Sequence, residues 1–212
     1  MRPLNFTVRR HMLKLTAYLT LLAGLCACAT SPPKVTTPVQ QPRTLAESGT
    51  AVDKPSYLNS VGCVDIAALN SKNTPTEILL GSRECVDKKD FDRGVSLFGV
   101  AGVYGRFDSQ RVPDVSAHEV IPAFQSAVFG NLDSETAAAF QAARKNLANS
   151  PKLVQMCAQI RKLGPPTYYP TYMIAHGMGA FLGSGPGLVA NFDSAAAWES
   201  ALATYLHCPT AP

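Results

Sequence analysis

The chain has 212 residues, of which 46% are hydrophobic and 16% are charged, a balance too apolar for a disordered protein and typical of a globular one. Its net charge of +4 arises near the N-terminus, where the first 14 residues carry four basic side chains, Arg2, Arg9, Arg10 and Lys14, and the first acid is Glu47. Without those four, 15 of the 19 basic side chains remain against 15 acidic ones. A neutral remainder excludes the electrostatic argument for nucleic acid as a partner.

Residues 15–25 form an uncharged apolar run directly after Lys14. Its length and basic flank are typical of a signal-peptide core, whereas a helix that spans a bilayer needs about 20 apolar residues. Translation from Met12 would supply the same basic flank as translation from Met1. The sequence therefore predicts export from the cytoplasm and leaves the start codon open.

The run ends in Leu25-Cys26-Ala27-Cys28, which resembles the bacterial lipobox, where an aliphatic residue and small residues precede a cysteine that is lipidated. The resemblance implies a signal peptide over residues 1–27 and attachment to the membrane through lipid on Cys28. Ala29 after that cysteine implies sorting to the outer membrane, with the protein anchored on its periplasmic face. Cleavage by ordinary signal peptidase, after Cys26 or Ala27, is the alternative and would give a soluble periplasmic protein.

Residues 28–50 combine the lipid anchor with a tether rich in Pro, Thr and Gln, including prolines at positions 32, 33, 38 and 42. A segment of this composition favours an extended conformation, with a rise of about 3.1 Å per residue. Residues 51–212 are then predicted to form one periplasmic domain, because their number suits a single core.

Four cysteines remain in that domain, an even number in an oxidising compartment, so disulfides are expected. Four cysteines can pair in three ways. Local pairing favours Cys63 with Cys85 and Cys157 with Cys208, since each pair would join neighbouring helices. Their spacing is too wide for a redox or zinc motif.

Helical signals recur along the domain and predict an all-α bundle with little room for a sheet. Pro75 and Glu77 stand in the first turn of one helix. Two apolar stripes then repeat at helical spacing, Phe91-Val95-Phe98 and Leu97-Ala101-Tyr104, which indicates a helix packed on both sides. Further helices are predicted from Ile121, bent or delayed by Pro122, from Asp133-Ser134 to about Leu147, from Ser150-Pro151 to Gly164, and from Asp193-Ser194 onward.

The residues Leu80-Gly81, Asp90-Phe91, Gly94, Phe98 and Ala101 resemble one tetratricopeptide or Sel1-type unit over residues 75–105. The resemblance implies two antiparallel helices that approach each other through small residues. No second copy follows at the period of about 34 residues that such arrays use. A plain helical hairpin is therefore the equal alternative.

Residues 164–192 are dense in Gly and Pro and carry three tyrosines. Because buried tyrosines order a loop, this segment is predicted to be a long ordered loop and the place for a binding surface. Its candidate binding residues are Tyr168, Tyr169, Tyr172 and His176.

His176 is also the candidate general base of a hydrolase, in a formal triad with Asp193 and with Ser184 as the nucleophile. A structural histidine that is hydrogen-bonded to the backbone is the more ordinary interpretation. No glycine pattern fits a phosphate loop and no ligand set fits a metal, so no cofactor and no metal are predicted. Arg106, Asp108, Arg111 and Asp114 are expected to form exposed ion pairs at a helix end, worth at most about 1 kcal/mol.

The leading functional hypothesis is a lipid-tethered envelope protein that acts without catalysis, as an interaction module or scaffold for another envelope protein. Its groove and its tyrosine-bearing loop would contact that partner. Two alternatives remain: an immunity or inhibitor lipoprotein directed against a secreted toxin, and an envelope hydrolase that uses His176.

Lipidation at Cys28 can be tested by metabolic labelling with a radioactive fatty acid. We expect the wild-type protein to be labelled and Cys28→Ser to be unlabelled, because the thiol that carries the lipid is gone. Cys26→Ser is the matched control and should keep its label. An unlabelled wild type, or equal labelling of Cys28→Ser, would contradict the anchor.

Overall fold

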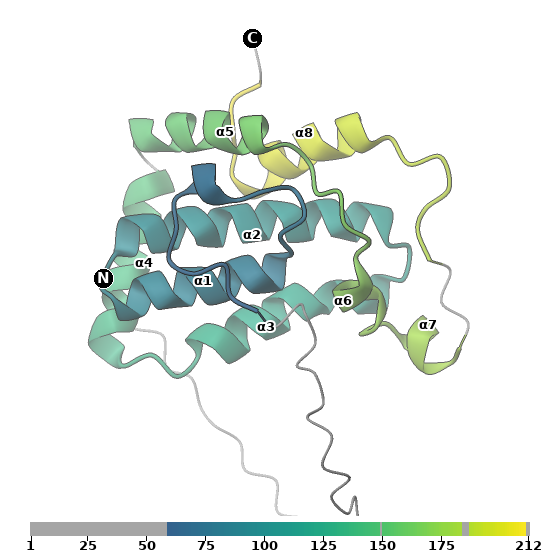
Figure 1. The fold of residues 1–212 in the computed structure, drawn as a ribbon, viewed down its shortest axis with the longest axis horizontal. Coiled ribbons are helices and arrows are strands. Elements are labelled where there is room, and N and C mark those ends of the chain that lie inside the picture. Colours follow the sequence, from purple (N-terminus) through teal and green to yellow (C-terminus); the bar gives the residue numbers. More distant parts are fainter. Residues whose placement is uncertain (1–58, 149, 184–186, 211–212) are drawn as a thin grey trace, which may run out of the picture. The chain divides into compact units, whose positions relative to one another are not determined.

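A computed structural model describes residues 59–148, 150–183 and 187–210. The predicted signal peptide, Cys28 and the tether lie outside these residues, as does Ser184. The described residues form eight α-helices and two 3₁₀ helices, with no β-strand among them, so the predicted all-α fold is confirmed. Figure 1 shows the arrangement, in which α2 (Phe91–Arg111) runs through the middle of the bundle.

The first hairpin is formed by α1 (Pro75–Asp87) and α2, joined by three residues. The predicted helix start is confirmed: the Glu77 amide donates to the Thr74 side chain, and the Thr74 amide donates to the Glu77 carboxylate at 2.8 Å. Such a capping box satisfies backbone N–H groups that the first helical turn leaves unpaired. Asp90 caps α2 in turn, by accepting from the Arg93 amide.

Small residues let the two helices of this hairpin approach. A Cβ on Gly94 would lie 3.1 Å from Val86 Cγ2, and the Ser82 hydroxyl donates to the Gly94 carbonyl at 2.7 Å. Gly81 has another neighbour, because its Cβ would collide with the carbonyl of Gly62 in the chain that leads into the domain. The helical hairpin is thus present, and its kinship with tetratricopeptide or Sel1 units stays a prediction.

The apolar stripes of α2 are buried except at Phe91, which is half-buried, and this confirms that the helix packs on two sides. Leu97, Ala101 and Tyr104 have no exposed surface, and Phe98 and Val95 are nearly covered. Figure 1 shows α1 and α3 (Val120–Phe129) on one side of α2, and α5 (Pro151–Leu163) and α8 (Ser194–Tyr205) on the other. Burial on this scale makes α2 the centre of the hydrophobic core.

The remaining helices begin close to where their capping residues predict. Pro122 lies in the first turn of α3, where its missing N–H costs no helical hydrogen bond, and the 3₁₀ helix η3 (Val115–Glu119) precedes it. Asp133 accepts from the Thr136 amide at the start of α4 (Ser134–Ala148). Asp193 accepts from the Ala196 amide at the start of α8.

The disulfides join Cys63 to Cys85 and Cys157 to Cys208, the connectivity that local pairing favours. The first bond fastens the chain before the 3₁₀ helix η2 (Ile66–Ala68) to α1. The second fastens the chain after α8 to α5. Both ends of the described domain are therefore held to its core by covalent bonds.

Residues 164–192 are only partly a loop, since they contain two one-turn helices, α6 (Thr171–Ile174) and α7 (Met178–Phe181). Both lie together at one end of the bundle (Figure 1). Among the described residues, none of the helices has the length and apolar composition to cross a bilayer.

The two disulfides should differ in how much they stabilise the domain. Each constrains the unfolded chain in proportion to the logarithm of the loop it closes, and the separations are 22 residues for Cys63–Cys85 and 51 for Cys157–Cys208. We expect the Cys→Ser double variants to lose about 3 and about 4 kcal/mol of unfolding free energy, respectively. Urea denaturation would measure both, and wild-type midpoints for the two variants would contradict this expectation.

Candidate interaction surface

A buried carboxylate fastens the segment 164–192 to the central helix. Asp108, on α2, has no exposed surface. Its Oδ2 accepts from the hydroxyls of Tyr168 at 2.8 Å and Tyr172 at 2.6 Å. Its Oδ1 accepts from Arg111 Nε at 2.7 Å. One side chain thus joins α2 to two of the predicted binding tyrosines.

This geometry corrects the expected exposed ion-pair cluster at residues 106–114. Asp108 and Arg111 do pair, with Nη2 2.6 Å from Oδ1, but both are buried. That Nη2 contact is electrostatic only, because no hydrogen bond from Nη2 has proper geometry. Arg106 is exposed and outside the pair, and Asp114 bonds elsewhere. The pair is buried because the guanidinium lies between two rings, 5.2 Å from the centroid of Phe107 and 5.3 Å from that of Tyr168.

Burial shapes the protonation of this cluster. Burial raises the pKa of Asp108, while the charge of Arg111 and the two tyrosine hydroxyls act in the opposite direction. Burial also raises the pKa of Tyr168 and of Tyr172 well above the ordinary value, and the Asp108 charge adds to that rise. The hydroxyls therefore stay protonated at neutral pH, as donors to Asp108 must be.

A second carboxylate holds α7. The Gly179 amide donates to Asp114 Oδ2 at 2.8 Å, and the Met178 amide donates to the Ser116 hydroxyl at 2.8 Å. A Cβ on Gly177 would collide with the Asp114 carboxylate, so glycine is needed there. The hydrogen bond from Ser116 and that from the Gly179 amide lower the pKa of Asp114. The anchor is therefore made by a charged carboxylate.

Further contacts hold the ends of the segment. The Thr167 amide donates to the Ser71 carbonyl at 2.8 Å, and Tyr104 donates to the Gly164 carbonyl at 3.1 Å. The Val189 amide donates to the Arg111 carbonyl at 2.9 Å. The described part of the segment is thus attached to the bundle at several points along its length.

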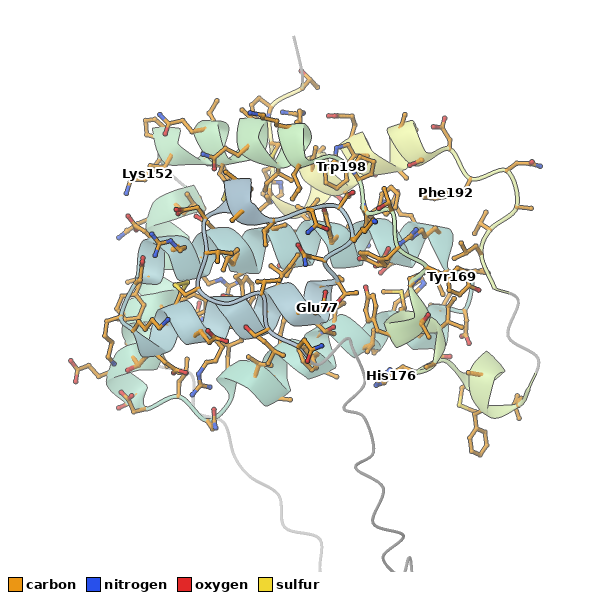
Figure 2. The ribbon with its side chains drawn as sticks, in the orientation of Figure 1. Glu77, Lys152, Tyr169, His176, Phe192 and Trp198 are labelled. Atoms are coloured by element: carbon orange, nitrogen blue, oxygen red, sulfur yellow. A yellow bond between two sulfur atoms is a disulfide. The ribbon has the colours of Figure 1, made fainter. Side chains whose placement is uncertain are left out.

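The four predicted binding residues have different positions. Tyr172 is buried and Tyr168 is half-buried, with both hydroxyls turned inward to Asp108. Tyr169 is 57% exposed, so the expectation that burial orders all three tyrosines is wrong for this one. Figure 2 shows Tyr169 and His176 at the same end of the domain. Only these two are available to a partner.

Most of the exposed large apolar side chains belong to the same segment as Tyr169. Eight such side chains are exposed among the described residues, and six of them lie within residues 164–192. We call these six the apolar end surface: Tyr169, Met178, Phe181, Leu182, Leu188 and Val189. Residues 164–192 contain no Asp, Glu, Lys or Arg. An exposed apolar surface without charge is typical of an interaction site.

Among the described residues, no contact of His176 or Asp193 supports the hydrolase alternative. His176 Nδ1 lies 2.8 Å from the Tyr172 carbonyl, and the ring is exposed to solvent. Asp193 is the cap of α8, and Ser184 lies outside the described residues. The hollows that we describe below are lined by other residues. No group of His, Cys, Asp or Glu within the described ranges could hold a metal ion.

The comparisons with known proteins identify no relative of this chain. No protein-family model matches the chain, and no curated protein or solved structure is significantly similar to it. The described residues define an all-helical, doubly disulfide-bonded domain that carries an uncharged apolar surface at one end. Any inference about function rests on that surface and on the chain's own chemistry.

Removal of the buried carboxylate should cost much of the domain's stability. We expect Asp108→Ala to lower the unfolding free energy by about 3–5 kcal/mol, because Arg111 would stay buried without its partner. Tyr172→Phe removes one hydrogen bond to a charged group and should cost about 1.5–3 kcal/mol. Arg106→Ala, at an exposed position of the same helix, is the control and should change stability by less than about 0.5 kcal/mol. Equal urea midpoints for Asp108→Ala and Arg106→Ala would refute this role of Asp108.

Proposed function

We propose that this protein is a lipid-anchored envelope protein whose domain acts as an interaction module. The lipid would be on Cys28, and the domain would sit on the periplasmic face of the outer membrane at the end of its tether. The apolar run at residues 15–25, followed by Leu25-Cys26-Ala27-Cys28, supports that location. The two disulfides are compatible with an oxidising compartment.

One observation carries the interaction function: six exposed apolar side chains belong to an uncharged segment that buried and polar anchors fix in place. Phe181 is 84% exposed and Leu182 is 68% exposed. Exposure of such side chains gives the isolated domain no stability, whereas their burial against a partner contributes about 25 cal/mol per Å² of apolar area. An anchored surface also loses less conformational entropy on binding than a free loop would.

The partner of this surface is proposed to be another envelope protein with an uncharged apolar face. Rim charges that would steer a charged partner are absent from residues 164–192. The immunity or inhibitor version of this function would use the same surface against a secreted toxin. No separate observation favours it over a resident envelope partner.

The interaction can be tested with a photo-crosslinking amino acid in place of Phe181, in the full-length protein in intact cells. We expect one dominant protein crosslink. The same amino acid in place of Val154, which is 56% exposed on α5, is the matched control and should not give that product. Phe181→Ser combined with Leu182→Ser should abolish recovery of the partner and leave the urea midpoint unchanged, because both side chains are exposed.

Two results would overturn the proposal. The first is crosslinking of position 181 to lipid alone, which would mean that the apolar end surface faces the membrane. The second is the same set of crosslinked products from positions 181 and 154, which would mean that the apolar end surface selects no partner.

A further inference from the structure

A hollow of about 420 Å³ is lined in part by α4, and Figure 1 shows α4 and α7 at opposite ends of the domain. Its volume is within the range of sites for small molecules, about 300–1,000 Å³. The apolar part of its lining combines side chains of α2, α4, α5 and the chain after α8: Val95, Phe98, Leu147, Leu153 and Leu206. An alkyl chain is the kind of group that such a wall would bury.

The wall is built by close packing on two sides and by sparse packing on a third. Gly99 lets Met156 and Leu206 pack against α2, since its Cβ would collide with Met156 and lie 3.4 Å from Leu206 Cδ2. The Cys157–Cys208 disulfide holds the chain after α8 against α5. The α4 helix buries only Thr136 and Phe140, so it packs sparsely against the rest of the bundle.

The charged part of the lining is basic. Arg144, Lys145 and His207 line the hollow, and no acidic residue among those that the structure describes does. Tyr205 is part of the same lining. Burial raises the pKa of Tyr205, while a hydrogen bond with Gln125 and the charge of Arg144 lower it, so the Arg144 charge acts on Tyr205. A lining that combines basic and apolar side chains complements a ligand with an anionic head and an apolar tail.

Arg144 differs from the other arginines of the domain. Each of the other described arginines that is at least half-buried forms an ion pair: Arg83, Arg93, Arg111 and Arg161. Arg144 is half-buried too, but it has no carboxylate within ion-pair distance among the described residues. It lies over Phe98, 4.3 Å from the ring centroid, and donates to Gln141 Oε1 at 3.3 Å. Its planar fork is suited to bind a carboxylate.

Two neighbouring hollows lack this combination. One of about 360 Å³ shares Phe98, Gln141 and Arg144 but has no other charged residue in its lining. One of about 660 Å³ shares Val95 and Leu147, and there Lys152 is already paired with Asp92 at 2.7 Å. Among these hollows of the described residues, the one of about 420 Å³ alone joins an arginine that has no ion pair there to further basic groups and apolar side chains.

We propose that this hollow binds an unbranched fatty acid, with the carboxylate on Arg144 and the alkyl chain between Leu147, Leu153 and Leu206. The site would be separate from the apolar end surface, and binding there would not require the partner proposed above. The charge selects the carboxylate over an alcohol, and the apolar wall selects the alkyl chain over a short acid.

The test is a calorimetric titration with dodecanoate, below its critical micelle concentration, of the full-length protein from which non-covalently bound lipid has been extracted. We expect saturable binding of one dodecanoate. Dodecanol, which has the same chain without the charge, should bind at least about tenfold more weakly, because it lacks the charged group that Arg144 would bind. Dodecyltrimethylammonium should not bind at this site.

Variants locate the site. We expect Arg144→Gln to weaken dodecanoate binding at least about tenfold and to leave dodecanol binding unchanged, with Arg144→Lys in between. Arg106→Gln is the matched control, and Phe181→Ser should also bind normally, which separates this site from the apolar end surface. Equal affinity for dodecanoate and dodecanol, no saturable binding by a folded protein, or unchanged binding by Arg144→Gln would each overturn the proposal. So would a dimer that Arg144→Gln dissociates, because a second copy would then cover the hollow.

Discussion

A single carboxylate determines how the end of this domain is built. Asp108 is buried on the central helix and accepts hydrogen bonds from Arg111, Tyr168 and Tyr172. A buried carboxylate is costly unless donors satisfy it, so the surrounding chain is constrained to bring those donors to one point. Two of the donors, Tyr168 and Tyr172, come from residues 164–192, so the cluster attaches this part of the segment to α2. The exposed apolar side chains of the segment lie between residues that hydrogen-bond to the helical bundle.

Local signals predict the helices well, because capping and apolar spacing act within a few residues. The starts at Thr74, Asp133 and Asp193 follow from side chains that accept from the first turns. The sequence also contains a signal for the burial of Asp108 and Arg111. Both continue the stripe Leu97-Ala101-Tyr104 by steps of four and three residues, but charged side chains were expected to be exposed.

Other features could not be predicted, because they depend on contacts between distant parts of the chain. Which tyrosines turn inward depends on the position of Asp108, 60 residues before Tyr168 and 64 before Tyr172. The hollow beside α4 depends on four parts of the chain at once. The position of Arg144 on an alanine-rich helix suggests an ordinary solvent-facing residue. Only the structure shows that Arg144 is half-buried over Phe98 and has no carboxylate within ion-pair distance among the described residues.

The two proposed sites are places where the described domain departs from rules that most of it obeys. Large apolar side chains are mostly buried in this domain, and half-buried arginines are mostly paired. The apolar end surface breaks the first rule and Arg144 breaks the second, and neither departure stabilises the isolated fold. Departures of this kind mark functional sites in natural proteins, where a binding partner supplies what the fold leaves out. An apolar protein face would complete the first site, and an anion with an alkyl chain would complete the second.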